Sequence, residues 1–223
     1  MSLAQAVLGL PQSVGRIVVE FLFAPAATMH AELLAAPSSL QGLGAASRAV
    51  MLARTHRPLT EPGVDWHREM DWRSIAHRTA VLPGDTLEAL AWYLGLAAHS
   101  RQLRRVVLRD DLLKLQSEGI VTEHLEFVYN LPELADAASL APALPVSDLA
   151  ASLWRAGWAS LAQCAASLPA AIGARLLLKL PAQAAKLSGV TSLSGPVFEH
   201  VRGVVVASLL PEFDESLQSL AAS

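Results

Sequence analysis

Four residues of the kinds that bind metals or act as acids and bases lie close together along the chain. They are His67, Glu69, Asp71 and His77. Histidine and carboxylate side chains ligate zinc and iron, and a histidine oriented by a carboxylate can act as a general base. The spacing matches no zinc or nucleophile signature, and a charged loop with incidental histidines explains it as well. We therefore expect no metal ligand and no catalytic residue here, with a metal-assisted hydrolase at residues 67–77 as the alternative.

The single cysteine, Cys164, is the one thiol that could serve as a nucleophile. No charged residue lies within eight positions of it on either side, so no neighbour along the chain would stabilise a thiolate. We predict that it is a small apolar core residue, and a lone cysteine also fits a reducing compartment. The sequence holds no phosphate-binding loop, dinucleotide fingerprint or G-x-S-x-G elbow, and we expect neither an enzyme nor a cofactor.

A group of arginines is the most distinct charged feature. Its members are Arg101, Arg104, Arg105 and Arg109. Steps of three and four residues place them on one face of a helix predicted to begin at residue 100, opposite Leu103 and two valines. Such a stripe could dock an acidic partner surface. The alternative is a solvated face paired locally with acidic neighbours at 110 and 111, which is the commoner meaning of a charge run.

Composition restricts the class of protein. The 223 residues are 52% hydrophobic and 17% charged, and the net charge is −3. Soluble domains average about 25% charged residues, so the chain is apolar enough for a large core and excludes a disordered or collagen-like protein. A slightly negative chain lacks the excess of positive charge that nucleic-acid binding requires, and we expect no nucleic-acid partner.

The spacing of apolar residues predicts helices along most of the chain. Stretches that show this spacing or are rich in leucine lie at 17–22, 29–35, 45–53, 72–77, 85–98, 100–108, 110–119, 122–130, 147–168, 172–180, 194–209 and 212–222. Asp85 and Asp110 are predicted N-caps, and Gly119 is predicted to end the helix before it. The result is an all-α fold, a compact single-domain bundle of roughly eight to ten helices, mostly short, over residues 1–223. An irregular insert at 55–84 and an Ala/Pro linker at 140–146 interrupt it.

Two apolar stretches bear on the membrane and on ligands. The N-terminal run is interrupted by Pro11 and lacks the pattern of a secretory signal. The uncharged run between Arg155 and Arg175 is diluted by serine, glutamine and proline, so we expect no membrane span and a cytoplasmic location. Trp154 and Trp158 on the helix predicted over 147–168 leave open a second alternative, an α-helical protein that binds a lipid or small ligand.

Two stretches resemble one family. The first is Phe21-Leu22-Phe23-Ala24-Pro25, followed by Met29-His30 and Leu33-Leu34. It is similar to the opening of the SctK/YscK proteins of bacterial type III secretion systems, with Met29 in place of an aromatic residue and Ala31 in place of a proline. The second covers residues 82–134 and resembles that family's central core. Its pattern is a leucine-rich helix, a short L-R-R-V-V helix, a leucine helix ending in glycine, and a helix with phenylalanine.

The resemblance implies a non-enzymatic, cytoplasmic, helical adaptor of the sorting platform. Such a protein would link the cytoplasmic domain of an SctD-like inner-membrane ring protein to an SctQ-like pod protein, near the ATPase and its stator. An adaptor works through surfaces with apolar anchors and charged rims. The candidate partner contacts are therefore Phe21, Phe23, Pro25 and His30 in one segment, and Arg101, Arg104, Arg105 and Arg109 in the other.

Overall fold

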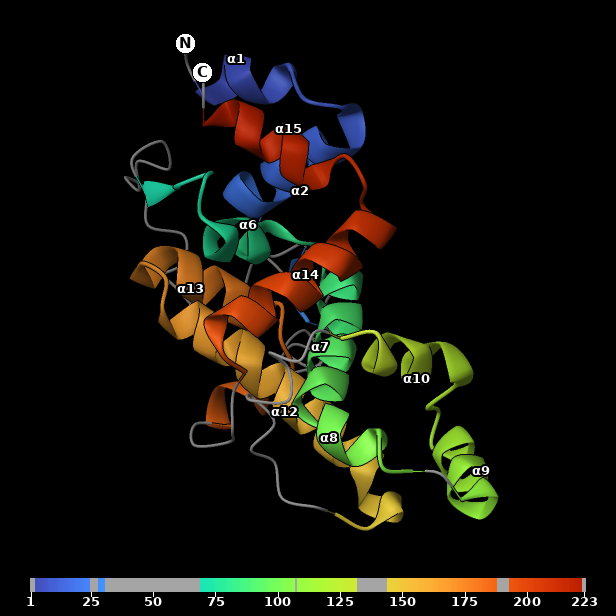
Figure 1. The fold of residues 1–223 in the computed structure, drawn as a ribbon. Helices are drawn as coiled ribbons and strands as arrows, with labels where there is room; N and C mark the ends of the chain where they lie inside the picture. The colour runs from blue at the N-terminus through green and yellow to red at the C-terminus, as the bar shows by residue number, and fades with distance from the viewer. Residues whose placement is uncertain are drawn as a thin grey trace, which may run out of the picture. The chain divides into compact units, whose positions relative to one another are not determined.

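The computed structural model describes residues 3–24, 28–30, 69–106, 108–131, 144–187 and 193–221. Within these ranges the chain forms eleven α-helices, nine of them with seven residues or more, and no β-strand (Figure 1). The all-α fold class is confirmed. The helix predicted at 45–53 and most of that predicted at 29–35 lie outside the described residues, while Met29 and His30 are not helical.

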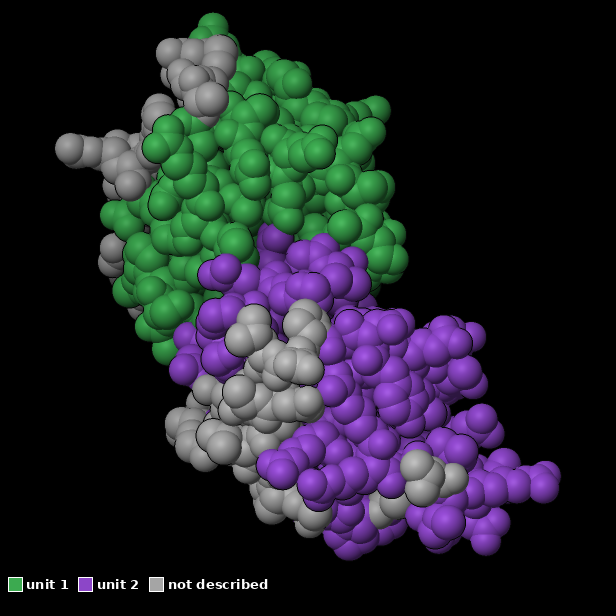
Figure 2. Space-filling view, viewed as in Figure 1, with its two compact units in different colours: residues 1–87, 164–186, 206–223 green, residues 88–163, 187–205 purple. Residues whose placement is uncertain are grey.

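The residues group into two compact units (Figure 2). Unit 1 comprises residues 1–87, 164–186 and 206–223, and unit 2 comprises residues 88–163 and 187–205. The single-domain organisation over 1–223 stays a prediction.

Unit 1 is built around the amphipathic helix α2. Its described helices are α1 (Leu3–Leu8), α2 (Gln12–Phe23), α6 (Ile75–Val81), α13 (Ala170–Leu178) and α15 (Phe213–Leu220). The buried stripe of α2 consists of Val14, Val18, Phe21 and Leu22, which recur at helical spacing. Helix α6 packs against both α2 and α13, so these three helices share one core.

Helix α6 corrects the prediction for the irregular insert. The short helix expected at 72–77 instead begins at Ile75 and ends at Val81. Pro83 accounts for its end, because the residue before a proline is displaced from helical conformation. The segment before it is anchored by Trp72, which is buried, and by Asp71, whose Oδ1 accepts the backbone N–H of Arg73 at 3.0 Å. Residues 55–68 of the insert lie outside the described residues.

Unit 2 contains α8 (Ser100–Leu103), α9 (Arg109–Ser117) and α10 (Thr122–Tyr129), together with most of three longer helices. The longer helices are α7 (Gly84–Ala98), α12 (Val146–Ala166) and α14 (Gly195–Leu209). Its core consists of fully buried aliphatic side chains from α7 to α12, namely Leu96, Leu103, Leu115, Ile120, Val128, Leu149 and Leu153. Of the predicted linker at 140–146, Leu144 and Pro145 are described and are not helical.

Two glycines set the close crossing of α7 and α12 within unit 2. A Cβ atom on Gly95 would overlap the carbonyl group of Leu153, and one on Gly157 would overlap the carbonyl group of Ala91. The two backbones therefore touch where any larger residue would separate the helices. Small residues at such a crossing allow tight packing, which adds dispersion energy along the rest of the contact.

Gly119 ends α9, as the sequence predicts. Its φ of 83° lies in the left-handed region, which glycine adopts without a steric penalty. The N–H of Gly119 donates to the carbonyl of Gln116 at 3.0 Å, and that of Ile120 donates to Leu115 at 2.9 Å. These two bonds form a Schellman motif, which satisfies carbonyls at the helix end and returns Ile120 to the core.

The two predicted aspartate caps are wrong in position. Helix α7 begins at Gly84 and α9 at Arg109, so Asp85 and Asp110 lie in the first turn rather than at the N-cap. A carboxylate there still stabilises the helix, because it faces the positive end of the helix dipole. In α7 the carboxylate of Asp85 accepts the N–H of Thr86 at 2.8 Å.

Candidate interaction surface

The arginine group does not form one helical stripe. Helix α8 ends at Leu103, and the chain turns before α9 begins at Arg109. The prediction of a continuous helix over 100–108 is therefore wrong. Two interactions turn the chain here: Leu103 is fully buried in the core of unit 2, and the N–H of Val106 donates back to its carbonyl at 3.1 Å.

Arg104 points inward and has a structural role. Its Nε and Nη2 donate to the carbonyl of Val128 at 3.2 and 3.0 Å, and Nη2 also donates to the carbonyl of Leu131 at 2.9 Å. These carbonyls lie at the C-terminal end of α10, where helix carbonyls lack partners within the helix and the helix dipole favours a cation. Arg104 thus joins the α8 turn to α10, and its charge is directed away from a partner.

The other three arginines are exposed, and Arg109 stands between two exposed leucines, next to Leu108 in the chain and one turn before Leu113 on α9. We define the α8–α9 surface as Arg101, Arg105, Leu108, Arg109 and Leu113. Leu108 is 65% exposed and Leu113 is 53% exposed. Arg109 and Leu113 are four residues apart on α9, so they share a face. Exposed leucines with an arginine beside them are typical of a protein-binding surface.

The local acidic residues do not pair with these arginines. Asp111 instead pairs with Lys114, with 3.4 Å between its Oδ1 and the lysine Nζ. Across the described part of the chain, no ion pair involves Arg101, Arg105 or Arg109. Their guanidinium groups can therefore donate hydrogen bonds to carboxylates of another protein.

The other predicted partner segment, Phe21–His30, divides between the interior and the surface. Phe21 is 1% exposed and belongs to the core of unit 1, whereas Phe23 is 70% exposed. Pro25 lies outside the described residues. His30 is half-buried, and its backbone N–H donates to the carbonyl of Leu178 at 2.8 Å. The expectation that Phe21 contacts a partner is corrected by its burial, because Arg175 and Lys179 cover its ring.

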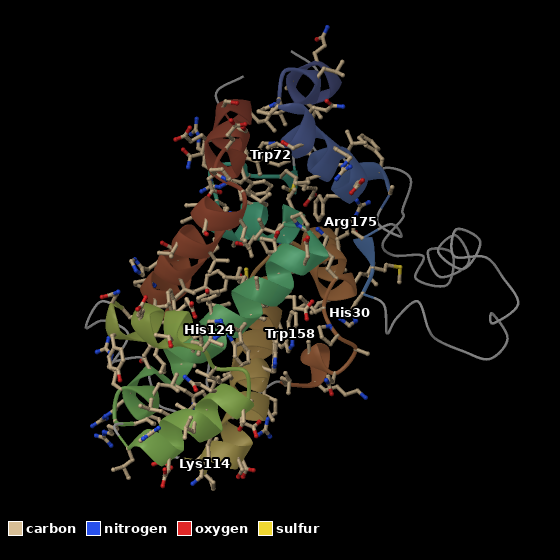
Figure 3. All side chains as sticks on the ribbon, turned by 90° about the vertical axis from the view of Figure 1, so that its right-hand side faces the viewer. His30, Trp72, Lys114, His124, Trp158 and Arg175 are labelled. Carbon is tan, nitrogen blue, oxygen red and sulfur yellow. The ribbon has the colours of Figure 1, made fainter. Side chains whose placement is uncertain are left out.

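Phe21 is covered by two cations that sequence reasoning missed: Arg175 of α13, labelled in Figure 3, and Lys179, which directly follows this helix. The guanidinium carbon of Arg175 lies 5.6 Å from the centre of the Phe21 ring, and the Nζ of Lys179 lies 4.8 Å from it. Arg175 also donates from Nη1 to the carbonyl of Phe21. Two cations four residues apart inside an otherwise apolar segment were the signal available in the sequence, because each needs a buried partner.

Lys179 closes the C-terminal end of α6. Its Nζ donates to the carbonyls of Ala80, Val81 and Leu82 at 2.9, 3.1 and 2.8 Å. The pKa of Lys179 is lowered to about 7, chiefly by burial and also by the nearby positive charge of Arg175, while Glu20 opposes both effects. Burial also lowers the pKa of Arg175 to about 10. All three ammonium donors are used by backbone carbonyls, so Lys179 links α13 to α6.

The predicted acid–base cluster is only partly described. Among the described residues no group of three or more His, Cys, Asp or Glu side chains could hold a metal ion, and His67 lies outside them. The backbone N–H of Asp71 donates to Nδ1 of His77 at 3.1 Å. Burial lowers the pKa of His77, while the charges of Asp71 and Glu69 raise it.

Two further predicted features belong to α12. Cys164 is buried, as expected of a small apolar core residue. Trp154 and Trp158 stack on each other with ring centres 5.8 Å apart, and Trp154 also packs on Trp92 at 4.9 Å. These tryptophan rings therefore contact one another.

One histidine–serine pair was not anticipated. Nε2 of His99 lies 3.1 Å from Oγ of Ser152, a geometry found in nucleophile–base pairs. His99 is only 2% exposed and connects the end of α7 to α12. Burial lowers the pKa of His99, as does the charge of Arg155, while Gln102 opposes this shift. A buried histidine hydrogen-bonded to a serine is a stabilising contact between helices.

Comparisons of the chain with protein-family models, curated protein sequences and solved structures found no match. Among the described helices, none is long and apolar enough to cross a membrane.

Proposed function

We propose that the protein is a non-enzymatic adaptor that acts at the cytoplasmic face of a bacterial type III secretion system. In this role it links an SctD-like inner-membrane ring protein to an SctQ-like pod protein and so supports protein export. The proposal begins from the family resemblance of residues 82–134. The described helices α7, α9 and α10 follow the order of the longer elements in that resemblance, including the glycine end at Gly119, whereas Arg104 and Arg105 of the L-R-R-V-V segment form a turn after α8.

The α8–α9 surface is the observation that carries the proposal. Leu108 and Leu113 supply exposed apolar area, and three exposed arginines carry positive charge on a chain whose net charge is −3. An apolar contact rimmed by cations fits a partner surface that has an apolar depression bordered by aspartate or glutamate. Arginine suits this role because its planar guanidinium binds a carboxylate through two parallel hydrogen bonds.

The experiment measures binding of the full chain to each of the two partners. The double variant Arg105→Glu, Arg109→Glu reverses two exposed charges without touching Arg104. We expect at least tenfold weaker binding to one of the two partners, with an unchanged circular-dichroism melt. Arg73→Glu is the matched control, because Arg73 is an exposed arginine of unit 1. The control should bind like the natural chain.

A separate variant tests the apolar part of the surface. Leu108→Ser removes a 65% exposed leucine, so it should weaken the same partner interaction and leave stability unchanged. Full-strength binding of both partners by the charge-reversed and Leu108→Ser variants would refute a role for this surface. Failure of the natural chain to bind either partner would refute the adaptor function itself.

A further inference from the structure

His124 lies where the first turn of α10 meets α7 in unit 2 (Figure 3). Its ring is packed edge-on against two aromatic side chains of α7. The ring centres lie 5.6 Å from Trp92 and 5.8 Å from Tyr93, with interplanar angles of 65° and 84°. Phe127, one turn further along α10, packs on Tyr93 at 4.7 Å. His124 is thus part of the aromatic contact that holds α10 to α7.

Two N–H groups are directed at the His124 ring. The backbone N–H of Val121 donates to Nδ1 at 3.3 Å. The Nε1–H of Trp92 lies 3.4 Å from Nδ1 and 3.3 Å from Nε2, so it meets the ring rather than a single atom. A neutral imidazole has a lone pair and a π face that accept such donors. An imidazolium carries N–H on both nitrogens and repels them, so both contacts require the neutral form.

The groups around His124 shift its pKa in both directions, and burial has the largest effect. Burial lowers the pKa of His124 below its ordinary 6.5, whereas the carboxylate of Glu123 and the carbonyl of Gly119 raise it. From α7 the titratable group facing the ring is the phenol of Tyr93, which is neutral at these pH values. Helix α12 reaches the cluster through the uncharged Trp154. The N–H groups directed at the ring favour the neutral imidazole, and the lowered pKa of His124 favours the same form.

We propose that protonation of His124 releases α10 from α7 and so makes the α8–α9 surface sensitive to acidification. Helix α10 anchors this surface through Arg104, which donates to the carbonyls of Val128 and Leu131. The regulatory consequence rests on the proposed function, whereas the release of α10 does not. Because the released state binds a proton more readily than the docked state, acidification below pH 6.5 favours release. The equilibrium shifts by up to tenfold for each pH unit.

Hydrogen exchange of the full chain between pH 7.5 and pH 5.0 tests the release. Protection factors of the α10 amides are compared, since these already correct for the intrinsic effect of pH on exchange. In the natural chain we expect α10 protection to fall by about tenfold, and that of α13 in unit 1 to change less. His124→Gln should abolish the fall, because a glutamine at this helix position still accepts the Val121 N–H and does not titrate.

The control variant is His200→Gln, which replaces an exposed histidine of unit 2 and should behave like the natural chain. Protection of α10 that is independent of pH in the natural chain would overturn the proposal. So would a fall that persists in His124→Gln, because another group such as His99 would then be responsible. No partner is present in this experiment, so its outcome is independent of whether the adaptor function holds.

Discussion

Arg104 and Val128 lie 24 positions apart and are joined by two hydrogen bonds from the guanidinium group to one carbonyl. This contact makes Arg104 partly buried, whereas its neighbour Arg105 is exposed. The two arginines look equivalent in the sequence, yet the fold gives them different roles. One holds the end of α10, and the other is available to a partner.

The first prediction compares these two residues. Arg104→Ala should lower the free energy of unfolding by about 2 kcal/mol, because it removes charge-assisted hydrogen bonds from partly buried carbonyls. Arg105→Ala should change it by less than about 0.5 kcal/mol, as for other exposed positions. Urea unfolding followed by circular dichroism measures both. Equal effects of the two variants would contradict the inward role of Arg104.

The second prediction concerns the crossing of α7 and α12. Gly157→Ala should destabilise the protein by about 3 kcal/mol, because its methyl group would overlap the carbonyl group of Ala91. Gly203→Ala is the control: it also lies inside a helix, α14, but an added Cβ meets nothing within 4 Å. Since alanine is the better helix former, Gly203→Ala should stabilise by about 0.5 kcal/mol. Thermal melts should show a lower melting temperature for Gly157→Ala and a higher one for Gly203→Ala.

The third prediction follows from the buried ammonium of Lys179. Its pKa is about 7 in the folded chain and 10.5 when exposed, so the unfolded chain binds more protons between these values. Stability due to this group therefore rises with pH from about 7 to 10.5, by at most about 1.4 kcal/mol per pH unit. Chemical denaturation at several pH values measures this slope.

Lys179→Met provides the comparison for that slope. Methionine keeps much of the side-chain volume but does not titrate. The variant should lose the Lys179 contribution to the slope, and at pH 7 it should be less stable because three carbonyls lose their donor. A slope identical to that of the natural chain would show that Lys179 keeps its ordinary pKa.

The fourth prediction concerns the attachment of α15. The Nε of Arg78 donates to Oδ1 of Asp214 at 2.9 Å, and its Nη1 donates to the carbonyls of Trp72 and Arg73. Arg78→Met should destabilise by about 3 kcal/mol, because the buried side chain holds three acceptors. Asp214→Asn should change stability by less than about 1 kcal/mol, since this carboxylate is partly exposed and the amide oxygen still accepts. Hydrogen exchange of α15 reports the local effect.

The helices themselves were largely predictable from the sequence. The stripe on α12, the glycine end of α9 and the stop of α10 before Leu131-Pro132 each depend on residues within a few positions of one another. Helical periodicity and turn chemistry depend on residues only a few positions apart, so they can be predicted from the sequence before the fold is known. The exposed leucine at 108 and the arginines at 101, 105 and 109 were also visible as residue types, though not as a surface.

Tertiary structure decided which of these side chains face inward. Arg104 bonds to a carbonyl 24 positions away, Lys179 to one 99 positions away, and Arg175 to one 154 positions away. Phe21, expected at a partner surface, is instead covered by Arg175 and Lys179. A cation can be buried only where carbonyls or an aromatic face replace water, and packing alone determines where such groups converge. Local pattern therefore sets the helices, and long-range packing sets which charges remain for function.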